Sequence, residues 1–449
     1  MSAADVWRAH RIYADRLARA GIDEGALVLS AAGNAPAAAP LLLACRALDA
    51  ALLPVDAGAT PREIDALAAR FDAAAIVLPA AVAVSAAIDS PSPLGDDDLV
   101  IAARAEGARR YAGTAILKLT SGSSGPPKAT LTTEAQLVAD CAHIVSAMEI
   151  RPDDVQIGAI PVSHSYGLGN LLLPLLVQGT ACVLRDAFVP QQVIADARRF
   201  GARVFPGVPF MFQYFVDNPP AEGWPPALCR AISAGAPLAP ETVRAFRDRF
   251  GIKIHTFYGA SETGGIAFDA DDEPDEAATV GLPLPGVTIS LRDDGRVHVR
   301  SDAVSSGYSE PGDGDAFVDG GFLTGDYGAW DARGRLILGG RVSSFVNVAG
   351  RKVVPHEVEQ VLRAMPGVAD ARIVAAPDAR RGQQIVACIV RDANAPPLDH
   401  VGIRRYCAAR LAAYKIPRTI VFVDAIPRTA RGKIDRAALD AVVRAHVRA

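Results

Sequence analysis

A loop of small residues, bounded on both sides by apolar runs, is the first segment of this sequence whose residue types could do chemistry. Residues 116–119 read ILKL, residues 120–128 read TSGSSGPPK, and residues 129–132 read ATLT. Glycine lets a backbone approach a ligand closely, and backbone N–H groups and serine hydroxyls can donate hydrogen bonds to phosphate oxygens. Lys128 adds a compact positive charge. The loop therefore predicts a phosphate cradle, although the same composition would also suit a flexible linker.

This loop lacks the spacing of a Walker loop, but it resembles the phosphate-loop signature of the adenylate-forming superfamily. That superfamily comprises acyl-CoA synthetases, peptide-synthetase adenylation domains and beetle luciferases. Further motifs resembling those of the family follow in the family's order along nearly the whole chain: PVSH at 161–164, SAGAP at 233–237, YGASE at 258–262, TGD at 324–326 and PRTARGKID at 427–435. The ordered series is much more specific than any single motif, and it implies an enzyme that uses ATP to activate a carboxylic acid.

The resemblance implies a role for each matching residue of a nucleotide site. Tyr258 would stack on adenine, the Ser261 hydroxyl would contact the α-phosphate in place of the usual threonine, and Glu262 would help to hold Mg²⁺, which prefers carboxylate and phosphate oxygens. Asp326 would accept hydrogen bonds from both ribose hydroxyls, and Arg341 would lie near the same ribose. The residues so assigned to ATP or AMP are Thr120, Ser121, Gly122, Ser123, Ser124, Gly125, Lys128, Ala234, Gly235, Ala236, Tyr258, Gly259, Ser261, Asp326 and Arg341.

The resemblance also implies the groups that act on the acid. Lys433 would bridge the carboxylate and the α-phosphate, where charge builds up in the transition state and a positioned ammonium is worth far more than in water. His164 would gate the carboxylate site, so Lys433, Glu262 and His164 are the expected catalytic residues. No acidic residue stands between positions 161 and 170, and an amino-acid substrate is therefore not expected, because a buried ammonium would need a partner.

The expected acid pocket is rich in apolar side chains, which suits an aryl or medium-chain acyl group. Its expected members are His164, Ser165, Tyr166, Phe205, Val208 and Gly259, with Phe210 and Phe257 as further apolar candidates.

The expected secondary structure that positions these residues changes along the chain, from alternating strands and helices to mainly strands. Strands are expected at 26–30, 52–55 and 75–78, with helices at 37–51 and from the capping box Thr60-Pro61-Arg62-Glu63 onward. Such alternation indicates α/β architecture with a largely parallel sheet. After about residue 280 the pattern becomes β-rich, with a hairpin of strands 287–291 and 296–300 around an Asp-Asp-Gly turn.

A smaller unit is expected from residue 342 onward. It should contain helices at 357–364 and 401–412 and strands at 371–375, 384–390 and 419–423. We therefore predict an α/β protein with a large N-terminal domain (1–341), built of α/β subdomains plus a β-rich subdomain. A small mobile α+β C-terminal domain (342–449) follows and carries Lys433. By the resemblance, Ser343 occupies the hinge position, where the family usually has an acidic residue, and Gly350 lines the tunnel for the thiol.

Composition excludes several other classes of protein. Of 449 residues, 50% are hydrophobic and 21% are charged, with a net charge of −4, which argues against binding nucleic acid as the main task. Six scattered cysteines without Cys-x-x-Cys spacing fit a reducing compartment. The first 17 residues carry charges every few positions, so a signal peptide is not expected, and no apolar run is long enough for a membrane span. We expect a cytoplasmic monomer or homodimer.

The predicted activity is that of an ATP-dependent acid–thiol ligase. A carboxylate would attack the α-phosphate of Mg-ATP, pyrophosphate would leave, and a thiol would then take the acyl group and release AMP. Coenzyme A is the first candidate for the thiol, and the phosphopantetheine of an acyl carrier protein acting in trans is the second. A degenerate nucleotide-binding protein is a third reading, and the joint presence of Lys433, Glu262 and Asp326 argues against it.

Overall fold

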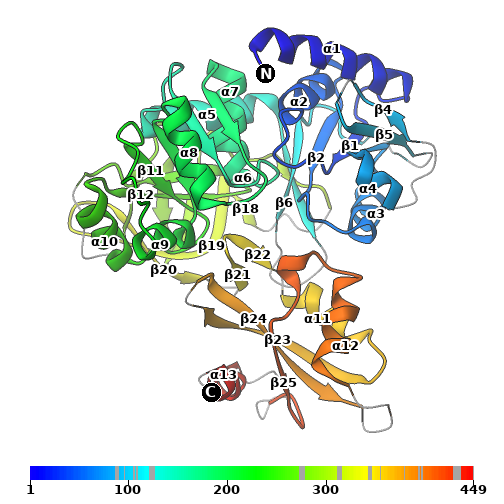
Figure 1. Cartoon of the computed structure of the whole chain (residues 1–449), viewed down its shortest axis with the longest axis vertical. Helices are drawn as coiled ribbons and strands as arrows, with labels where there is room; N and C mark the ends of the chain where they lie inside the picture. The colour runs from blue at the N-terminus through cyan, green and yellow to red at the C-terminus, as the bar shows by residue number, and fades with distance from the viewer. Residues whose placement is uncertain are drawn as a thin grey trace. The chain divides into compact units, whose positions relative to one another are not determined.

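The computed structural model describes residues 1–85, 91–95, 97–104, 107, 110–120, 127–272, 279–310, 316–341, 346–353, 355–378, 380–392, 395, 398–427 and 436–447. The chain divides into two compact units, one formed mainly by residues up to Val342 and the other mainly by the residues that follow. Two large sheets belong to the first unit and a five-stranded sheet to the second (Figure 1). The prediction of a mixed α/β fold with a large N-terminal part and a small C-terminal part is confirmed.

The first sheet has eight strands in the order β17-β7-β6-β2-β1-β3-β5-β4 and a parallel centre. The β1 strand is buried along its whole length, as expected for a parallel strand covered on both faces. The strands are β1 (Leu27–Ser30), β2 (Ala51–Pro54), β3 (Ala75–Pro79), β4 (Ser92–Pro93), β5 (Leu99–Ala103), β6 (Ile116–Thr120), β7 (Lys128–Thr132) and β17 (Gly307–Tyr308). The helices of this part are α1 (Ala3–Arg19), α2 (Ala38–Ala47), α3 (Pro61–Arg70) and α4 (Ala80–Ser85).

Local signals account for the helix boundaries in this part. The capping box predicted at the start of α3 is present, because the Thr60 backbone N–H donates to Glu63 Oε2 at 2.9 Å and the Glu63 N–H donates to Thr60 Oγ1 at 3.3 Å. The predicted helix 37–51 is too long. The α2 helix ends at Ala47, and Asp49 takes a left-handed backbone conformation (φ 49°) that turns the chain into β2.

The second sheet has twelve strands among the described residues, in the order β15-β16-β19-β20-β14-β13-β12-β11-β10-β8-β9, with β18 beside β19. Its parallel half is β8 (Val155–Gly158), β9 (Ala181–Leu184), β10 (Val204–Gly207), β11 (Arg230–Ser233) and β12 (Ile254–Ala260). Its antiparallel half is β13 (Gly264–Phe268), β14 (Thr279–Pro283), β15 (Thr288–Leu291), β16 (Arg296–Arg300), β18 (Phe317–Val318), β19 (Gly321–Trp330) and β20 (Leu336–Arg341). The predicted hairpin is therefore confirmed as β15 and β16.

Helices cover the parallel half of this sheet (Figure 1). They are α5 (Glu134–Met148), α6 (Ser165–Gly167), the π-helical turn η1 (Leu168–Leu172), α7 (Leu173–Gln178), α8 (Pro190–Phe200), α9 (Pro209–Asp217) and α10 (Pro240–Phe250). Ile144 and Met148 of α5 pack into one core with Phe257 and Tyr258. Phe205, Phe212 and Phe246 belong to a separate aromatic-rich core. The two faces of the sheet thus bury different sets of side chains.

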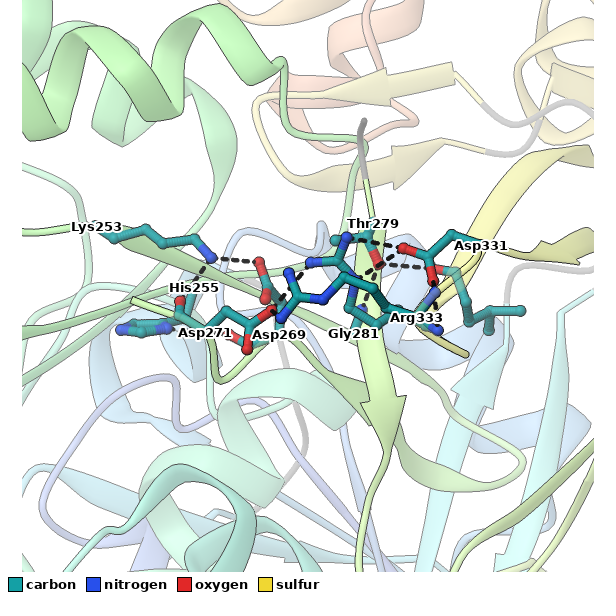
Figure 2. Close-up of polar contacts among 10 residues, drawn as sticks. Lys253, His255, Asp269, Asp271, Thr279, Gly281, Asp331 and Arg333 are labelled. Atoms are coloured by element: carbon teal, nitrogen blue, oxygen red, sulfur yellow. Dashed lines mark hydrogen bonds and ion pairs between the residues drawn. The ribbon is translucent and has the colours of Figure 1, made fainter. Parts of the chain in front are cut away.

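A charged cluster fastens the loop between β19 and β20 to strand β12 (Figure 2). Lys253 Nζ lies 2.8 Å from Asp269 Oδ2, and both side chains are buried. The same ammonium donates to the Asp271 carbonyl at 2.6 Å, while Asp271 Oδ2 lies 3.0 Å from Arg335 Nη1. Arg335 also lies 2.8 Å from Asp331, whose loop begins directly after β19. Buried pairs of this kind fix one arrangement, since removal of one partner would leave a buried charge uncompensated.

The second unit carries a five-stranded sheet in the order β22-β21-β24-β23, with β25 beside β24. Its elements are β21 (Val346–Val348), β22 (Arg351–Val353), α11 (Pro355–Arg363), β23 (Val368–Asp378), β24 (Gly382–Arg391), α12 (His400–Ala408), the 3₁₀ turn η3 (Ala413–Lys415), β25 (Thr419–Phe422) and α13 (Arg436–Val447). One core contains Val358 and Leu362 of α11 with Ile403 of α12, and another contains Leu439 and Val443 of α13. The predicted helix 401–412 is shorter in the structure, where α12 gives way to η3.

Candidate functional site

The phosphate-loop motif starts and ends on two paired strands. Thr120 is the last residue of β6 and Lys128 the first residue of β7, and the two are directly opposite each other in the antiparallel ladder. The loop between them is therefore held at both ends by the sheet. Of the predicted phosphate contacts, Ser121, Gly122, Ser123, Ser124 and Gly125 lie outside the described residues, and their roles stay predictions.

The YGASE motif forms a turn between β12 and β13. The ladder between these strands shifts register at Tyr258 and Gly259, and such bulges re-aim side chains near sites. Ser261 and Glu262 lie in the turn itself. A side chain at position 259 would not fit, since a Cβ there would lie 2.7 Å from the Gly264 carbonyl oxygen. This small-residue requirement explains the glycine of the motif.

The histidine motif reaches this turn through a serine pair. Ser165 Oγ and Ser261 Oγ lie 2.8 Å apart, so two segments separated by 96 residues share one hydrogen bond. His164, directly before α6, has a side chain that is 44% exposed, and its Nε2 lies 3.5 Å from Asp56 Oδ2. The imidazole is therefore half open to solvent, but its Nε2 atom is buried and faces the Asp56 carboxylate.

Two residues that the sequence did not single out hold the His164 segment. Asp56 lies two residues after the end of β2 and is 9% exposed. Asn34 is 7% exposed, donates to the Ile160 carbonyl at 2.9 Å and accepts from the Val162 N–H at 2.8 Å. Asn34 thereby joins the loop after β1 to the PVSH segment. No local pattern marks either residue, because each acts on a segment more than 100 positions away.

A hydrogen bond joins the adenine candidate Tyr258 on β12 to the ribose candidate Asp326 on β19. Tyr258 is 8% exposed and Asp326 is 7% exposed, and the tyrosine hydroxyl donates to Asp326 Oδ2 at 2.7 Å. The Asp326 N–H donates to Thr324 Oγ1 at 3.1 Å, so the TGD motif is also held locally. Arg341 is the cross-strand partner of Asp326 in the β19–β20 ladder. The side chain of Arg341 lies outside the described part of the structure.

The Glu262 carboxylate has a partner that the sequence did not predict. The hydroxyl of Tyr308 donates to Glu262 Oε1 at 3.0 Å, and Lys128 Nζ lies 5.5 Å from the centroid of the same tyrosine ring. Tyr308 reaches this place because β17 pairs with β7 at the edge of the first sheet. A two-residue strand carries too little pattern to be found from sequence, so Tyr308 was missed.

Two buried ionisable side chains interact electrostatically with each other, and one of them also with Glu262. Lys118 of β6 and Asp140 of α5 are 5% and 7% exposed. Burial lowers the pKa of the Lys118 ammonium, and the negative charges of Asp140 and Glu262 oppose that shift. Burial raises the pKa of the Asp140 carboxyl, against the nearby charge of Lys118 and a 2.8 Å hydrogen bond from the Gly265 N–H. Asp140 thus anchors the start of β13 through the Gly265 N–H.

Glycine is required where the chain passes this buried carboxylate. Gly264 has φ +69°, and a Cβ at this position would lie 2.2 Å from Asp140 Oδ1. The SAGAP turn that follows β11 contains Gly235, also with a left-handed φ of 82°, between Ala234, which is 4% exposed, and Ala236. These small residues keep space free beside the strand ends.

The predicted acid-pocket residues separate into two groups. The Tyr166 hydroxyl donates to the Ile232 carbonyl at 3.0 Å, and its ring centroid lies 5.8 Å from that of Phe257. Val208 follows β10, directly before α9, and is 5% exposed. The ring contacts of Phe205 and Phe210 belong instead to the aromatic core, with Phe212 and Phe215 around the former and Phe188 beside the latter. Val208 belongs to the same core as Phe205, and Tyr166 packs against both cores. The acid-pocket roles of all these residues stay predictions.

The C-terminal candidates are placed only in part. Gly350 lies in the turn between β21 and β22 with φ 83°, and its N–H donates to Asn347 Oδ1 at 2.9 Å. Ser343 and Lys433 lie outside the described residues. Their roles as hinge and catalytic lysine stay predictions.

Glu262 is the candidate metal ligand of the site. Within the described ranges, no group of three or more His, Cys, Asp or Glu side chains is arranged to hold a metal. Mg²⁺ is commonly bound by one or two carboxylates together with nucleotide phosphates, and the single carboxylate of Glu262 fits that mode. Among the same residues, no helix combines the length and the apolar character needed to cross a membrane.

Comparisons with known proteins agree with this arrangement. Residues 1–309 match the family model described as AMP-binding enzyme, and residues 357–433 match the AMP-binding enzyme C-terminal domain. The chain is 32% identical over 339 residues to sulfoacetate–CoA ligase of Cupriavidus necator, covering 72% of this chain and 66% of that protein. It is 31% identical over 333 residues to 2-succinylbenzoate–CoA ligase of Enterococcus faecalis, covering 71% and 68%.

A solved structure resembles the whole chain. The amide bond synthetase McbA of Marinactinospora thermotolerans superposes with a TM-score of 0.85 at 28% identity, covering 98% of this chain and 95% of McbA. The structural match therefore covers nearly all of both chains. The sequence match to the sulfoacetate ligase, in contrast, covers slightly less than two thirds of that protein.

Proposed function

This chain belongs to the AMP-binding enzyme family, and from that membership we propose that it is an ATP-dependent acid–thiol ligase working through an acyl-adenylate. The prediction of an adenylate-forming, acyl-CoA synthetase-like chain is confirmed at the level of the family. The activity of the whole protein, its acid and its acceptor are proposals. We also propose that residues 1–341 and 342–449 act as its two functional domains, with Ser343 as the hinge between them.

The observation that carries the proposal is the convergence of motif residues around Glu262. Its turn is joined to the histidine motif through Ser165 and Ser261, and its carboxylate is joined through Tyr308 to the surroundings of Lys128. The Glu262 carboxylate and the Tyr308 hydroxyl therefore lie close to Lys128, where the phosphate loop ends. The Ser261 hydroxyl belongs to the same turn as Glu262. This set supports binding of a polyphosphate, for which a protein needs cations, hydrogen-bond donors and a ligand for Mg²⁺.

The proposed chemistry has two steps with these residues in named roles. A carboxylate oxygen of the acid attacks the α-phosphorus of ATP, and the bond to pyrophosphate breaks. The Ser261 hydroxyl donates to the α-phosphate, and Asp326 accepts from the ribose hydroxyls. Glu262 would hold Mg²⁺, which neutralises phosphate charge when bound. In the second step a thiolate attacks the acyl carbonyl and AMP leaves.

Two residues are proposed to act on the acid itself. His164 gates the carboxylate end of the pocket, and its exposed imidazole near Asp56 supports that role. Lys433 stabilises the negative charge that develops between the acid and the α-phosphate. The buried apolar side chains of Val208 and Phe257, with the Tyr166 ring against Phe257, support an aryl or medium-chain acid. Similarity to 2-succinylbenzoate–CoA ligase also supports an aryl acid, and similarity to sulfoacetate–CoA ligase makes a short sulfonated acid the alternative to test.

Coenzyme A is the proposed acceptor, with Gly350 in its tunnel, since both of these relatives are CoA ligases. A carrier-protein phosphopantetheine is the alternative thiol. The scattered cysteines support a cytoplasmic location for the enzyme.

The test is a panel of carboxylic acids assayed in two ways. Acid-dependent exchange of radiolabelled pyrophosphate into ATP reports adenylation, and thioester formation with coenzyme A, a carrier protein or neither reports the acceptor. We expect at least one aryl or medium-chain acid to stimulate exchange and to give a CoA thioester. If no acid on the panel stimulates exchange, the proposed function is wrong.

A further inference from the structure

The short strand β17 is fixed between the phosphate-loop strand and the Glu262 turn. The Ser309 N–H donates to the Ala129 carbonyl at 2.8 Å, which ties the strand to β7. The Ser305 N–H donates to the Glu262 carbonyl at 2.8 Å, which ties the preceding residues to the turn. Tyr308 lies between these two anchors, and its backbone position is therefore set relative to both neighbours.

The Tyr308 side chain contacts both charged candidates of the site at once. Its hydroxyl donates to Glu262 Oε1 at 3.0 Å, and the face of its ring lies under the Lys128 ammonium, 5.5 Å from Nζ to the ring centroid. The ring is held from the side by Phe317, whose centroid lies 5.1 Å away at an angle of 77°. A rigid side chain with two torsions thus joins an anion on one turn to a cation on another strand.

We propose that Tyr308 is a positioning residue that couples Lys128 to Glu262 when Mg-ATP binds, an inference that rests on the proposed function. The hydroxyl donates to one oxygen of the Glu262 carboxylate, and the other oxygen would be left to hold the metal ion. The ring face supports the Lys128 ammonium, because a cation is attracted to the negative face of an aromatic ring. Hydrogen-bonding partners of metal-ligating carboxylates commonly change metal affinity by about 10- to 100-fold when removed.

Two substitutions at this position separate the two contacts. Tyr308→Phe removes the hydroxyl and keeps the ring, whereas Tyr308→Leu removes both. Tyr111→Phe is the control for loss of a tyrosine hydroxyl away from the site, since the Tyr111 hydroxyl also donates a hydrogen bond, at 2.8 Å to the Phe71 carbonyl. Tyr111 is the more deeply buried of the two, at 2% exposure, whereas Tyr308 is half-buried. Circular dichroism and thermal melting establish that each variant is folded.

The primary readout is binding in the absence of acid. Electron paramagnetic resonance measures Mn²⁺ binding in the presence of α,β-methylene-ATP, and calorimetry measures binding of the same nucleotide without metal. For Tyr308→Phe we expect the Mn²⁺ dissociation constant to rise by about 10-fold, with metal-free nucleotide binding unchanged. For Tyr308→Leu we expect both to weaken, and for Tyr111→Phe neither. Wild-type Mn²⁺ binding by Tyr308→Phe overturns the proposal, even if Tyr308→Leu fails to fold.

A second readout separates this inference from the proposed function. The Mg²⁺ concentration for half-maximal pyrophosphate exchange should rise in Tyr308→Phe, while the KM for the acid stays at the wild-type value. If the wild type exchanges pyrophosphate and Tyr308→Phe has the same Mg²⁺ dependence, the inference about Tyr308 fails alone. If no acid stimulates exchange by the wild type, the proposed function fails, and the Mn²⁺ titration still decides the role of Tyr308.

Discussion

The hydroxyl of Tyr258 donates a 2.7 Å hydrogen bond to Oδ2 of Asp326, and both side chains are buried. This bond joins the motif proposed to bind adenine to the motif proposed to bind ribose, 68 positions apart in the chain. The tyrosine therefore has two proposed uses: its ring faces the base, and its hydroxyl fixes the carboxylate that accepts from the sugar. The nucleotide would meet a carboxylate that is already oriented.

Replacement of Tyr258 by phenylalanine tests this double use. The ring stays, but a nearly buried carboxylate loses a donor, which costs about 1.5–3 kcal/mol for a hydrogen bond to a charged group. We expect lower resistance to urea and a higher KM for ATP. Tyr327→Phe, next to Asp326 on β19, is the control, because Tyr327 is 39% exposed and its change should stay within about 0.5 kcal/mol. Equal effects of the two variants would contradict the assigned role.

We predict that substitutions of Lys118 and Asp140 have coupled effects on the free energy of unfolding. Lys118→Met removes a buried cation whose charge lowers the pKa of the buried Asp140 carboxyl, so the free energy of unfolding should fall. Asp140→Asn keeps an acceptor for the Gly265 N–H, whose bond is 2.8 Å long, and removes the charge. Urea unfolding of both single variants and the double variant should therefore show the double variant to be more stable than the sum of the singles predicts. Simple additivity would show that the two charges do not interact.

We predict that His255 makes the free energy of unfolding depend on pH. Burial, followed by the nearby charge of Arg230, lowers the pKa of His255 from 6.5 to about 4. Between these values the unfolded chain takes up a proton on this side chain and the folded chain does not, so the free energy of unfolding falls as pH drops from 6.5 toward 4. Two and a half pKa units correspond to roughly 3 kcal/mol. We expect His255→Asn to remove this part of the pH dependence, as measured by urea unfolding at pH 7 and pH 4.5. An unchanged slope in the variant would contradict the assignment.

The sequence predicted the motif residues because each motif is local, with its spacing written in consecutive positions. The strand ends at Thr120 and Lys128, the hairpin of β15 and β16 and the α3 capping box are local in the same way. Tyr308 and Asp140 were missed because they belong to a two-residue strand and to a helix that carry no recognisable spacing. Only the pairing of β17 with β7, and the packing of α5 against β13, brings them to the site.

One predicted helix boundary is wrong, and the two faces of one strand could not be told apart from the sequence. Side chains alternate between the two faces of a strand, and in β10 Val204 enters the core shared with Phe257 while Phe205 enters the aromatic core. The apolar character of Phe205 does not reveal which face of β10 it occupies, and its role in the acid pocket stays a prediction. The end of α2 was misplaced because the helix and the strand after it are both buried and apolar, so no change in periodicity marks Ala47.

The most direct test of the central claim compares wild type with Lys433→Ala in acid-dependent ATP–pyrophosphate exchange, using the acid that the panel identifies. A lysine that meets charge only in the transition state should be worth about 10²- to 10³-fold in rate. We predict exchange by the wild type and a loss of at least that size in Lys433→Ala, with an unchanged thermal melting curve. Exchange by Lys433→Ala at the wild-type rate, or no exchange by the wild type with any acid, would contradict the account.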